Sequence, residues 1–203
     1  MIAIVDYDMG NVASVANMLK RIGAPVPVLT RDPEVLRKAS KIILPGVGSF
    51  DKGMRNLTEF GLRPALEEAA QERRVPVLGI CLGMQLLTKS SEEGAEPGLG
   101  WIDATTMRFR FPPQSGLKIP HMGWNHVTAP RPNPLIRGDE RSRFYFVHGY
   151  YVECSRPEDV IGTARYGFDF TCAVNRENIY GVQFHPEKSH KFGMALLEGF
   201  VGI

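Results

Sequence analysis

The sequence predicts an α/β fold: a mostly parallel central sheet flanked by helices, with an antiparallel strand extension. Three observations predict it. Wholly apolar runs recur in the first half of the 203-residue chain, stretches with helical spacing separate them, and strand-like runs crowd the second half. Strands that are apolar on both faces and alternate with helices form parallel sheets covered on both sides. The length suits one sizeable core, so we expect a single domain over residues 1–203.

Each element of the first half follows from such a pattern. Apolar residues at helical spacing predict helices over 12–22 and 62–70, and a further helix over 84–89. Pro45 and Gly46 are expected to stop the third strand. The short apolar runs that predict buried strands are 2–5, 26–29, 41–44 and 75–80.

The second half is predicted to be richer in strands. A tight hairpin connection is expected at 175–178, and apolar spacing over 192–200 predicts a closing helix. The Pro- and Gly-rich segment 111–134 is predicted to be mainly loop. The strand candidates are 144–147, 160–166, 170–175 and 179–184.

Composition argues against several classes of protein. Lys and Arg total 24 against 22 Asp and Glu, a net charge of +2 without a basic run, which disfavours nucleic-acid binding. No apolar run approaches the roughly 20 residues that span a bilayer, and no signal peptide is evident. Cys81, Cys154 and Cys172 form no CxxC, and His121 and His126 lack metal-ligand spacing. We expect a cytoplasmic protein with free thiols, no membrane contact and no metal.

The segment 79–83 has the form G-x-C-x-G, with Cys81 between an apolar strand and a helix. This is the strand–turn–helix context of a nucleophile elbow. The positive end of the helix dipole favours a thiolate there. A buried cysteine acting as a small apolar residue is the alternative, but the flanking glycines favour the nucleophile.

A nucleophilic cysteine needs an imidazole and often a third group that orients the ring. His185 follows the apolar run 179–184, so it lies at the carboxyl end of a strand, where open α/β sheets carry their sites. Glu187, two residues later, faces the same side of an extended chain. His148 ends another strand-like run and is interpreted as an ordinary polar residue that could face a pocket.

The glycine-rich segment 45–48 follows the third strand. Acyl transfer needs backbone N–H groups aimed at the oxyanion, and glycines permit the required close approach. A phosphate-binding loop would need a Lys-Ser/Thr that the chain lacks, and a plain turn is the remaining alternative.

Together these segments resemble the class I, or triad, glutamine amidotransferases. That family carries a glycine-rich oxyanion loop, a G-x-C-x-G elbow and a late H-P-E, here 45–48, 79–83 and 185–187. Within the family, five segments look like the glutaminase subunits of imidazole glycerol phosphate synthase: D-Y-x-x-G-N at 6–11, P-G-V-G-x-F at 45–50, M-G-W-N at 122–125, Y-F-V-H at 145–148 and H-P-E-K-S at 185–189.

The resemblance implies that glutamine is hydrolysed to glutamate and ammonia. The ammonia would pass to a cyclase subunit, a (β/α)₈ barrel, which makes imidazole glycerol phosphate and an aminoimidazole carboxamide ribonucleotide in histidine biosynthesis. It implies no metal or organic cofactor. The glutaminase subunit of another synthase and a stand-alone Cys-His hydrolase remain the alternatives.

The resemblance also assigns roles to residues. Cys81 would be the nucleophile, His185 the base and Glu187 the group that orients it. The oxyanion and substrate residues would be Gly46, Val47, Gly48, the backbone N–H of Leu82, and Gln85. Asn11, Trp124, Tyr145 and Lys188 would line the contact with the cyclase.

Overall fold

The central sheet combines a parallel half with an antiparallel half. The computed structural model describes residues 1–136 and 142–203. The strands of this sheet are β1 (Ile2–Val5), β2 (Val28–Thr30), β3 (Lys41–Gly46), β4 (Val77–Cys81), β5 (Ser90–Ser91), β6 (Ala104–Arg108), β9 (Tyr150–Cys154), β10 (Val160–Tyr166), β11 (Phe168–Arg176) and β12 (Ile179–Val182). A second, two-stranded sheet pairs β7 (His121–His126) with β8 (Arg143–His148).

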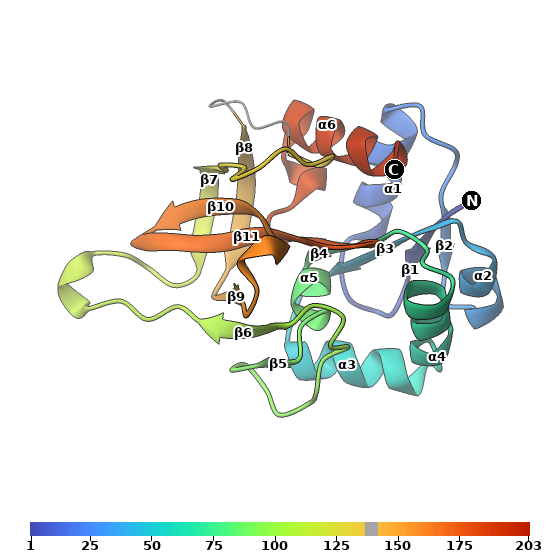
Figure 1. Cartoon of the computed structure of the whole chain (residues 1–203), viewed down its shortest axis with the longest axis horizontal. Helices are drawn as coiled ribbons and strands as arrows, with labels where there is room; N and C mark the ends of the chain where they lie inside the picture. Colours follow the sequence, from blue (N-terminus) through green and yellow to red (C-terminus); the bar gives the residue numbers. More distant parts are fainter. Residues whose placement is uncertain (137–141) are drawn as a thin grey trace.

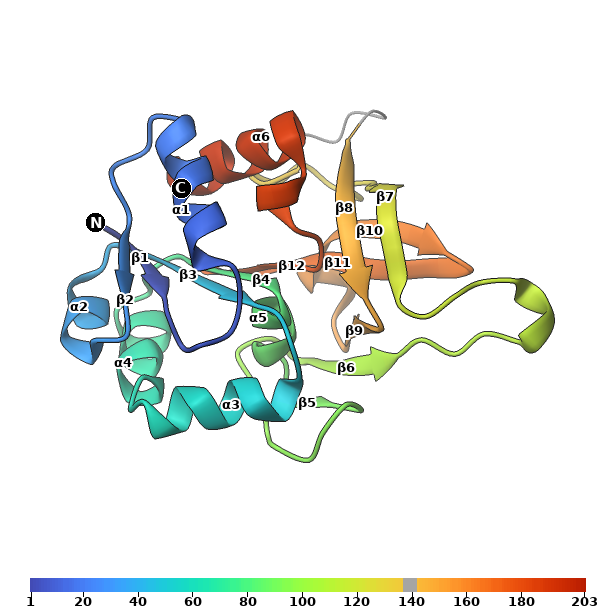
Figure 2. The ribbon, with the colours of Figure 1, turned by 180° about the vertical axis from the view of Figure 1, so that it is seen from behind.

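Helices cover both faces of the parallel half (Figures 1 and 2). They are α1 (Val12–Arg21), α2 (Pro33–Lys38), α3 (Phe50–Glu59), α4 (Arg63–Glu67) continued by a π-helical turn η1 (Glu68–Glu72), α5 (Leu82–Leu86) and α6 (His190–Val201). The described residues also form three 3₁₀ turns: η2 (Pro113–Ser115), η3 (Pro157–Asp159) and η4 (Pro186–Lys188). No helix in the described ranges is long and apolar enough to cross a membrane.

The strand order is β2-β1-β3-β4-β12-β11-β9-β6-β5, with β10 beside β11. Neighbours from β2 to β12 are parallel, whereas β12, β11, β9 and β6 are antiparallel in succession. The predicted fold class, a mostly parallel sheet with an antiparallel extension, is therefore confirmed. The turn between β11 and β12 is the predicted hairpin, since Arg176 pairs with Ile179.

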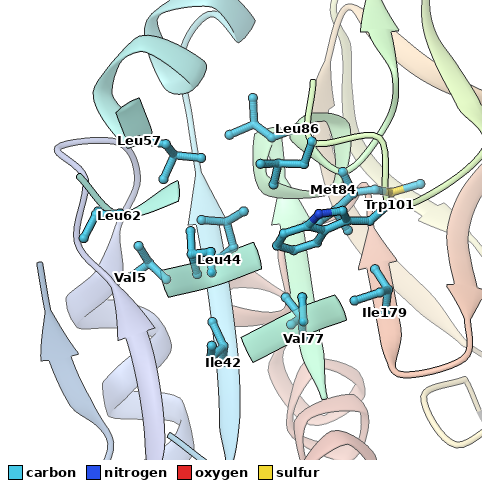
Figure 3. Close-up of a cluster of buried hydrophobic side chains, with 14 of the residues drawn as sticks. Val5, Ile42, Leu44, Leu57, Leu62, Val77, Met84, Leu86, Trp101 and Ile179 are labelled. Atoms are coloured by element: carbon cyan, nitrogen blue, oxygen red, sulfur yellow. The ribbon is translucent and has the colours of Figure 1, made fainter. Parts of the chain in front are cut away.

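The core lies on both faces of the sheet because strand residues alternate between them. In β1, Ala3 and Val5 pack toward α2, α3 and α4, while Ile2 and Ile4 pack toward α1 and α6. Figure 3 shows the first of these clusters, in which Leu44 and Val77 of neighbouring strands lie near other apolar side chains of the cluster. These layers fix the carboxyl ends of β3, β4 and β12 side by side.

Several predicted boundaries were wrong. β3 continues through Pro45 and Gly46, which pair with β4. On its other side β3 pairs with β1 only up to Ile43, so no hydrogen bond to β1 is lost because Pro45 has no N–H. The predicted loop at 111–134 contains β7, whose strand pattern is masked by Gly123 and Asn125. The second strand lies at 28–30 rather than 26–29, and α5 begins at Leu82 rather than at 84. Helices α2 and α3 were not predicted.

Candidate active site

Cys81 occupies a strained turn between β4 and α5. Its φ is +55° and its ψ is −111°, a backbone conformation that residues with a side chain rarely adopt. A Cβ on Gly83 would lie 1.8 Å from the carbonyl oxygen of Leu44, and a Cβ on Gly79 would lie 2.6 Å from the oxygen of Gly83. Close packing therefore requires both glycines of the G-x-C-x-G segment, and the turn presents Cys81 at the end of the sheet.

His185 and Glu187 lie beside this turn because β12 runs parallel to β4. Val182 pairs with Ile80, so the chain leaving β12 reaches the same sheet edge as Cys81. The Nδ1 of His185 donates to Oε1 of Glu187 at 2.7 Å, and these side chains are 2% and 5% exposed. The structure thus brings together the three residues that the sequence analysis selected.

The surroundings of His185 favour its protonated form. Burial lowers the pKa of His185, but the interactions with Cys81 and Glu187 outweigh burial and raise this pKa to about 9. The other ring nitrogen, Nε2, is buried without a well-formed hydrogen bond. Proton exchange between the imidazole and the sulfur is the chemistry that this arrangement allows.

A cavity of about 320 Å³ opens above Cys81, at the lower end of the range of small-molecule sites, about 300–1,000 Å³. Of the predicted oxyanion and substrate residues, Val47, Gly48, Leu82 and Gln85 line it, whereas Gly46 does not. Gly46 is buried at the end of β3, where it pairs with Cys81 in the sheet register. The full lining is Val47, Gly48, Cys81, Leu82, Gln85, Glu93, Pro120, Val147, His148, Gly149, Tyr150 and His185.

The oxyanion segment and the helix start meet at this cavity. Val47 is 46% exposed, and Gly48 has a φ of +114°, which a residue with a side chain would adopt under strain. Leu82 is the first residue of α5, so its N–H has no acceptor within the helix. The Leu82 N–H is therefore a backbone donor that is available beside Cys81.

Gln183, which the sequence analysis did not select, contacts the nucleophile directly. Its Nε2 donates to the Sγ of Cys81 at 3.7 Å, and its Oε1 accepts from Nε2 of Gln85 at 3.0 Å. Gln85, predicted to hold substrate, thus also supports the residue that contacts the sulfur. Gln183 lies just past β12, and its position two residues before His185 was the signal that could have identified it.

Two histidines on the second sheet were also missed as a pair. His148 lines the cavity and donates from Nδ1 to the carbonyl oxygen of Tyr150 at 2.7 Å, so its Nε2 accepts from Nδ1 of His121 at 2.9 Å. Burial lowers the pKa of His121 to about 4 and that of His148 to about 3. Both rings are therefore neutral at pH 7 and hold the backbone at 148–150 against the cavity.

Glu93 supplies a carboxylate to the cavity wall. Its Oε2 accepts from the backbone N–H of Phe50 at 2.8 Å, at the start of α3. Burial raises the pKa of Glu93, and the hydrogen bond from Phe50 opposes this effect. No sequence pattern pointed to Glu93, because its place depends on the loop that follows β5. Among the described residues, no group of three or more His, Cys, Asp or Glu could hold a metal ion.

Three of the four predicted interface residues form one exposed cluster. Trp124 of β7 pairs across the second sheet with Tyr145 of β8, their rings 6.3 Å apart, and the Nζ of Lys188 lies 5.7 Å from the Tyr145 ring. Asn11 is exposed at the start of α1, where its Oδ1 accepts from the N–H of Ser14, an N-cap contact. Among the described residues, no hydrogen bond, ion pair or ring contact joins Asn11 to Trp124, Tyr145 or Lys188.

Comparison with known proteins places this geometry in context. The family model for class-I glutamine amidotransferases matches residues 3–202. The imidazole glycerol phosphate synthase subunit HisH 2 of Methanococcus maripaludis is 55% identical over 202 residues, covering 99% of this chain and 98% of the relative. The subunit of the same name in Pseudomonas aeruginosa is 52% identical over 204 residues, all of both chains.

Solved structures show the same fold at lower identity. A crystal structure of a glutamine amidotransferase superposes with a TM-score of 0.77 at 19% identity, covering 100% of both chains. The structure of PurLQS from Thermotoga maritima gives a TM-score of 0.73 at 19% identity, covering 99% of this chain and 97% of the other. At such identities the likeness concerns the fold alone.

Proposed function

Because the chain belongs to the class-I glutamine amidotransferase family, we propose that it is the glutaminase subunit of an imidazole glycerol phosphate synthase. It would hydrolyse glutamine and pass ammonia to a cyclase that makes imidazole glycerol phosphate and an aminoimidazole carboxamide ribonucleotide in histidine biosynthesis. The observation that carries the proposal is that Cys81 and His185 line one cavity, while Glu187 is hydrogen-bonded to the imidazole of His185.

The proposed reaction begins at Cys81. The proton given up by the thiol is held on Nε2 of His185, whose raised pKa favours the imidazolium, and the sulfur attacks the side-chain amide carbon of glutamine. His185 then gives this proton to the amide nitrogen, ammonia leaves, and a thioester remains on Cys81. Water attacks the thioester with His185 as base, which releases glutamate and restores the thiol. Glu187 holds the ring through Nδ1 and stabilises the imidazolium.

Substrate binding follows from the cavity lining. The Leu82 N–H and a donor from the segment 46–48 would stabilise the oxyanion. Glu93 supplies a negative charge that suits the ammonium group of glutamine, and Gln85 would hold the substrate near the sulfur. The neutral pair His121 and His148 keeps the opposite wall in place without adding a positive charge beside His185.

The partner face is proposed to be the surface around Trp124, Tyr145 and Lys188, with Asn11 at its margin. Trp124 is 43% exposed and Met122, on the same face of β7, is 62% exposed. An adjoining cavity of about 660 Å³ brings together the cations Arg21, Arg143, Lys188 and Lys191, and Glu187 is the only carboxylate among the described residues that line it. This surface suits an acidic docking region on a (β/α)₈ cyclase, in one cytoplasmic heterodimer.

Glutaminase assays in three conditions test the proposal: the chain alone, with the cyclase, and with the cyclase plus its nucleotide ligand. Ammonia released without an acceptor wastes glutamine, so we expect little activity alone and the highest activity in the third condition. The expected reason is that a peptide of segment 46–48 in the free subunit points its carbonyl, and not its N–H, toward the substrate. The loss of that oxyanion donor would lower the rate about 10²–10³-fold, and docking of the loaded cyclase would turn the peptide into its active form. Equal rates in all three conditions would favour a stand-alone hydrolase. A response to a different synthase would reassign the acceptor.

A further inference from the structure

The hydroxyl of Tyr7 is a buried donor without an acceptor. Tyr7 follows β1 at the carboxyl edge of the sheet and is 0% exposed, yet its Oη has no hydrogen-bond partner among the described residues. Buried hydroxyls nearly always have one, and each exception needs a physical explanation. Neither the proposed triad nor the substrate contacts use this group.

The unpartnered hydroxyl lies against the oxyanion segment. A Cβ on Gly46 would be 2.5 Å from the Tyr7 Oη, 2.9 Å from Cβ of Leu82 and 3.1 Å from the backbone nitrogen of Gly83. Tyr7 therefore sits where the loop after β3 meets the turn that carries Cys81. Any larger residue at position 46 would be driven into the hydroxyl.

The segment that carries Tyr7 is held firmly. The side-chain amide of Asn56 donates to the carbonyl oxygen of Tyr7 at 2.8 Å. Arg31 pairs with Asp6 at 2.9 Å and with Asp8 at 2.8 Å, on either side of Tyr7. By contrast, residues 47–49, which follow Gly46, are exposed. If the segment around Tyr7 and the oxyanion loop move relative to each other, we therefore expect the loop to change its conformation.

The hydroxyl keeps its proton. Burial raises the pKa of Tyr7 far above its usual value, and the nearby Cys81 raises it further. Tyr7 is thus a neutral O–H donor at every pH at which the protein works. A backbone carbonyl of the neighbouring loop could become its acceptor if the loop changed its conformation.

We propose that Tyr7 is a positioning residue for the oxyanion loop, donating a hydrogen bond to a carbonyl of segment 46–48 in the active form of the loop. When a peptide of segment 46–48 turns its N–H toward the substrate, its carbonyl turns away from the cavity, toward the side on which the Tyr7 hydroxyl lies. The bond exists only in the active form, so it favours that form over the resting one. This inference rests on the proposed function, because it assumes that the loop serves glutamine hydrolysis.

The substitution Tyr7→Phe tests it, since it removes the hydroxyl and keeps the ring. In the complex with cyclase and nucleotide ligand, we expect kcat for glutamine to fall about fivefold, the effect of one neutral hydrogen bond of about 1 kcal/mol. The KM for glutamine and the ammonia-dependent synthesis should stay within twofold. The isolated variant should melt at the same temperature as the parent chain or higher, because an unpaired buried hydroxyl is lost.

Tyr180→Phe is the matched control. Tyr180 is also buried, but its hydroxyl interacts with Asn175, far from the oxyanion loop. This variant should melt lower and keep its kcat. A Tyr7→Phe chain that melts lower than the parent would overturn the inference, because the hydroxyl would already be bonded at rest. A full kcat in the stimulated complex would also overturn it. If the parent complex hydrolyses no glutamine, the proposed function fails, and the melting comparison alone decides on Tyr7.

Discussion

The backbone N–H of His185 donates to the backbone oxygen of Tyr145 at 2.9 Å. Ser189 bridges the same two residues: its Oγ accepts from the backbone N–H of Tyr145 at 3.0 Å and donates to the backbone oxygen of His185 at 2.6 Å. The side chain of Tyr145 meanwhile packs beside Trp124 and Lys188 on the outer surface. The proposed base and the proposed partner face therefore belong to one hydrogen-bonded unit, and a shift of β8 on docking reaches His185 through its main chain.

Replacing the proposed nucleophile, Cys81, should separate glutamine-dependent synthesis from ammonia-dependent synthesis. Cys81→Ala should abolish glutamine-dependent synthesis but leave synthesis from free ammonia intact, because the thiol serves only to release nitrogen from glutamine. Both rates are measured on the purified complex. Cys154→Ala, which changes a cysteine outside the cavity, is the control and should retain both activities. Appreciable glutamine hydrolysis by the Cys81→Ala complex would exclude Cys81 as the nucleophile.

The two partners of the thiol should differ in importance. His185→Ala removes the proposed base, with an expected loss of about 10⁶ in kcat. Glu187→Gln removes the charge proposed to orient that base, with an expected loss of about 10⁴ by comparison with other triads. Steady-state glutaminase rates in the complex give the ratio, and circular dichroism checks the fold. A greater loss in Glu187→Gln than in His185→Ala would contradict the assigned roles.

The raised pKa of His185 makes stability depend on pH. The folded-state value of about 9 exceeds the ordinary value of about 6.5, so the stabilisation is complete below pH 6.5 and is lost as pH rises through 9. The melting temperature of the parent chain minus that of His185→Gln should therefore shrink between pH 6.5 and 9.5. Each 1 kcal/mol corresponds to about 2–4 °C at this chain length. A difference that grows with pH would show that His185 is neutral in the folded chain.

The parts of the fold that could be predicted are those in which burial shapes the sequence directly. Ile2–Val5 is apolar on both faces because helices cover both faces of β1, and this pattern needs no knowledge of its neighbours. Helix α3 was overlooked although Phe50, Met54 and Leu57 have helical spacing, because its polar residues and Gly53 dilute the pattern. β7 gains its order from pairing with β8, which no local signal reveals.

The site divides in the same way. Cys81 and His185 were found because each ends an apolar strand next to glycine or proline. Tyr7, Glu93 and Gln183 were not, since their importance comes from contacts with segments 39, 43 and 102 positions away in the chain, at Gly46, Phe50 and Cys81. Sequence spacing selected the groups that are proposed to perform the chemistry, whereas the groups that hold them depend on the tertiary fold.

Reversing one charge on the proposed partner face should weaken assembly. Lys188 is exposed above the Tyr145 ring, in a surface where cations predominate, so Lys188→Glu should repel an acidic partner. We expect at least a tenfold weaker association with the cyclase at low salt and a shallower dependence on salt, measured by calorimetric titration. Lys38→Glu on α2 is the control, since Lys38 is also exposed and α2 lies at the end of the molecule away from β7 and β8 (Figure 1).

The same variant tests the link between docking and chemistry. At protein concentrations that saturate the weakened complex, the cyclase should still stimulate the glutaminase activity of Lys188→Glu less than that of the parent chain. The variant lacks the ammonium group above the Tyr145 ring, and the backbone oxygen of Tyr145 accepts from the N–H of His185. Stimulation is taken as the ratio of kcat with and without cyclase. If saturation restores the full ratio, Lys188 contributes to affinity alone. Docking of the cyclase would then affect the active site by another route, such as the loop that Tyr7 faces.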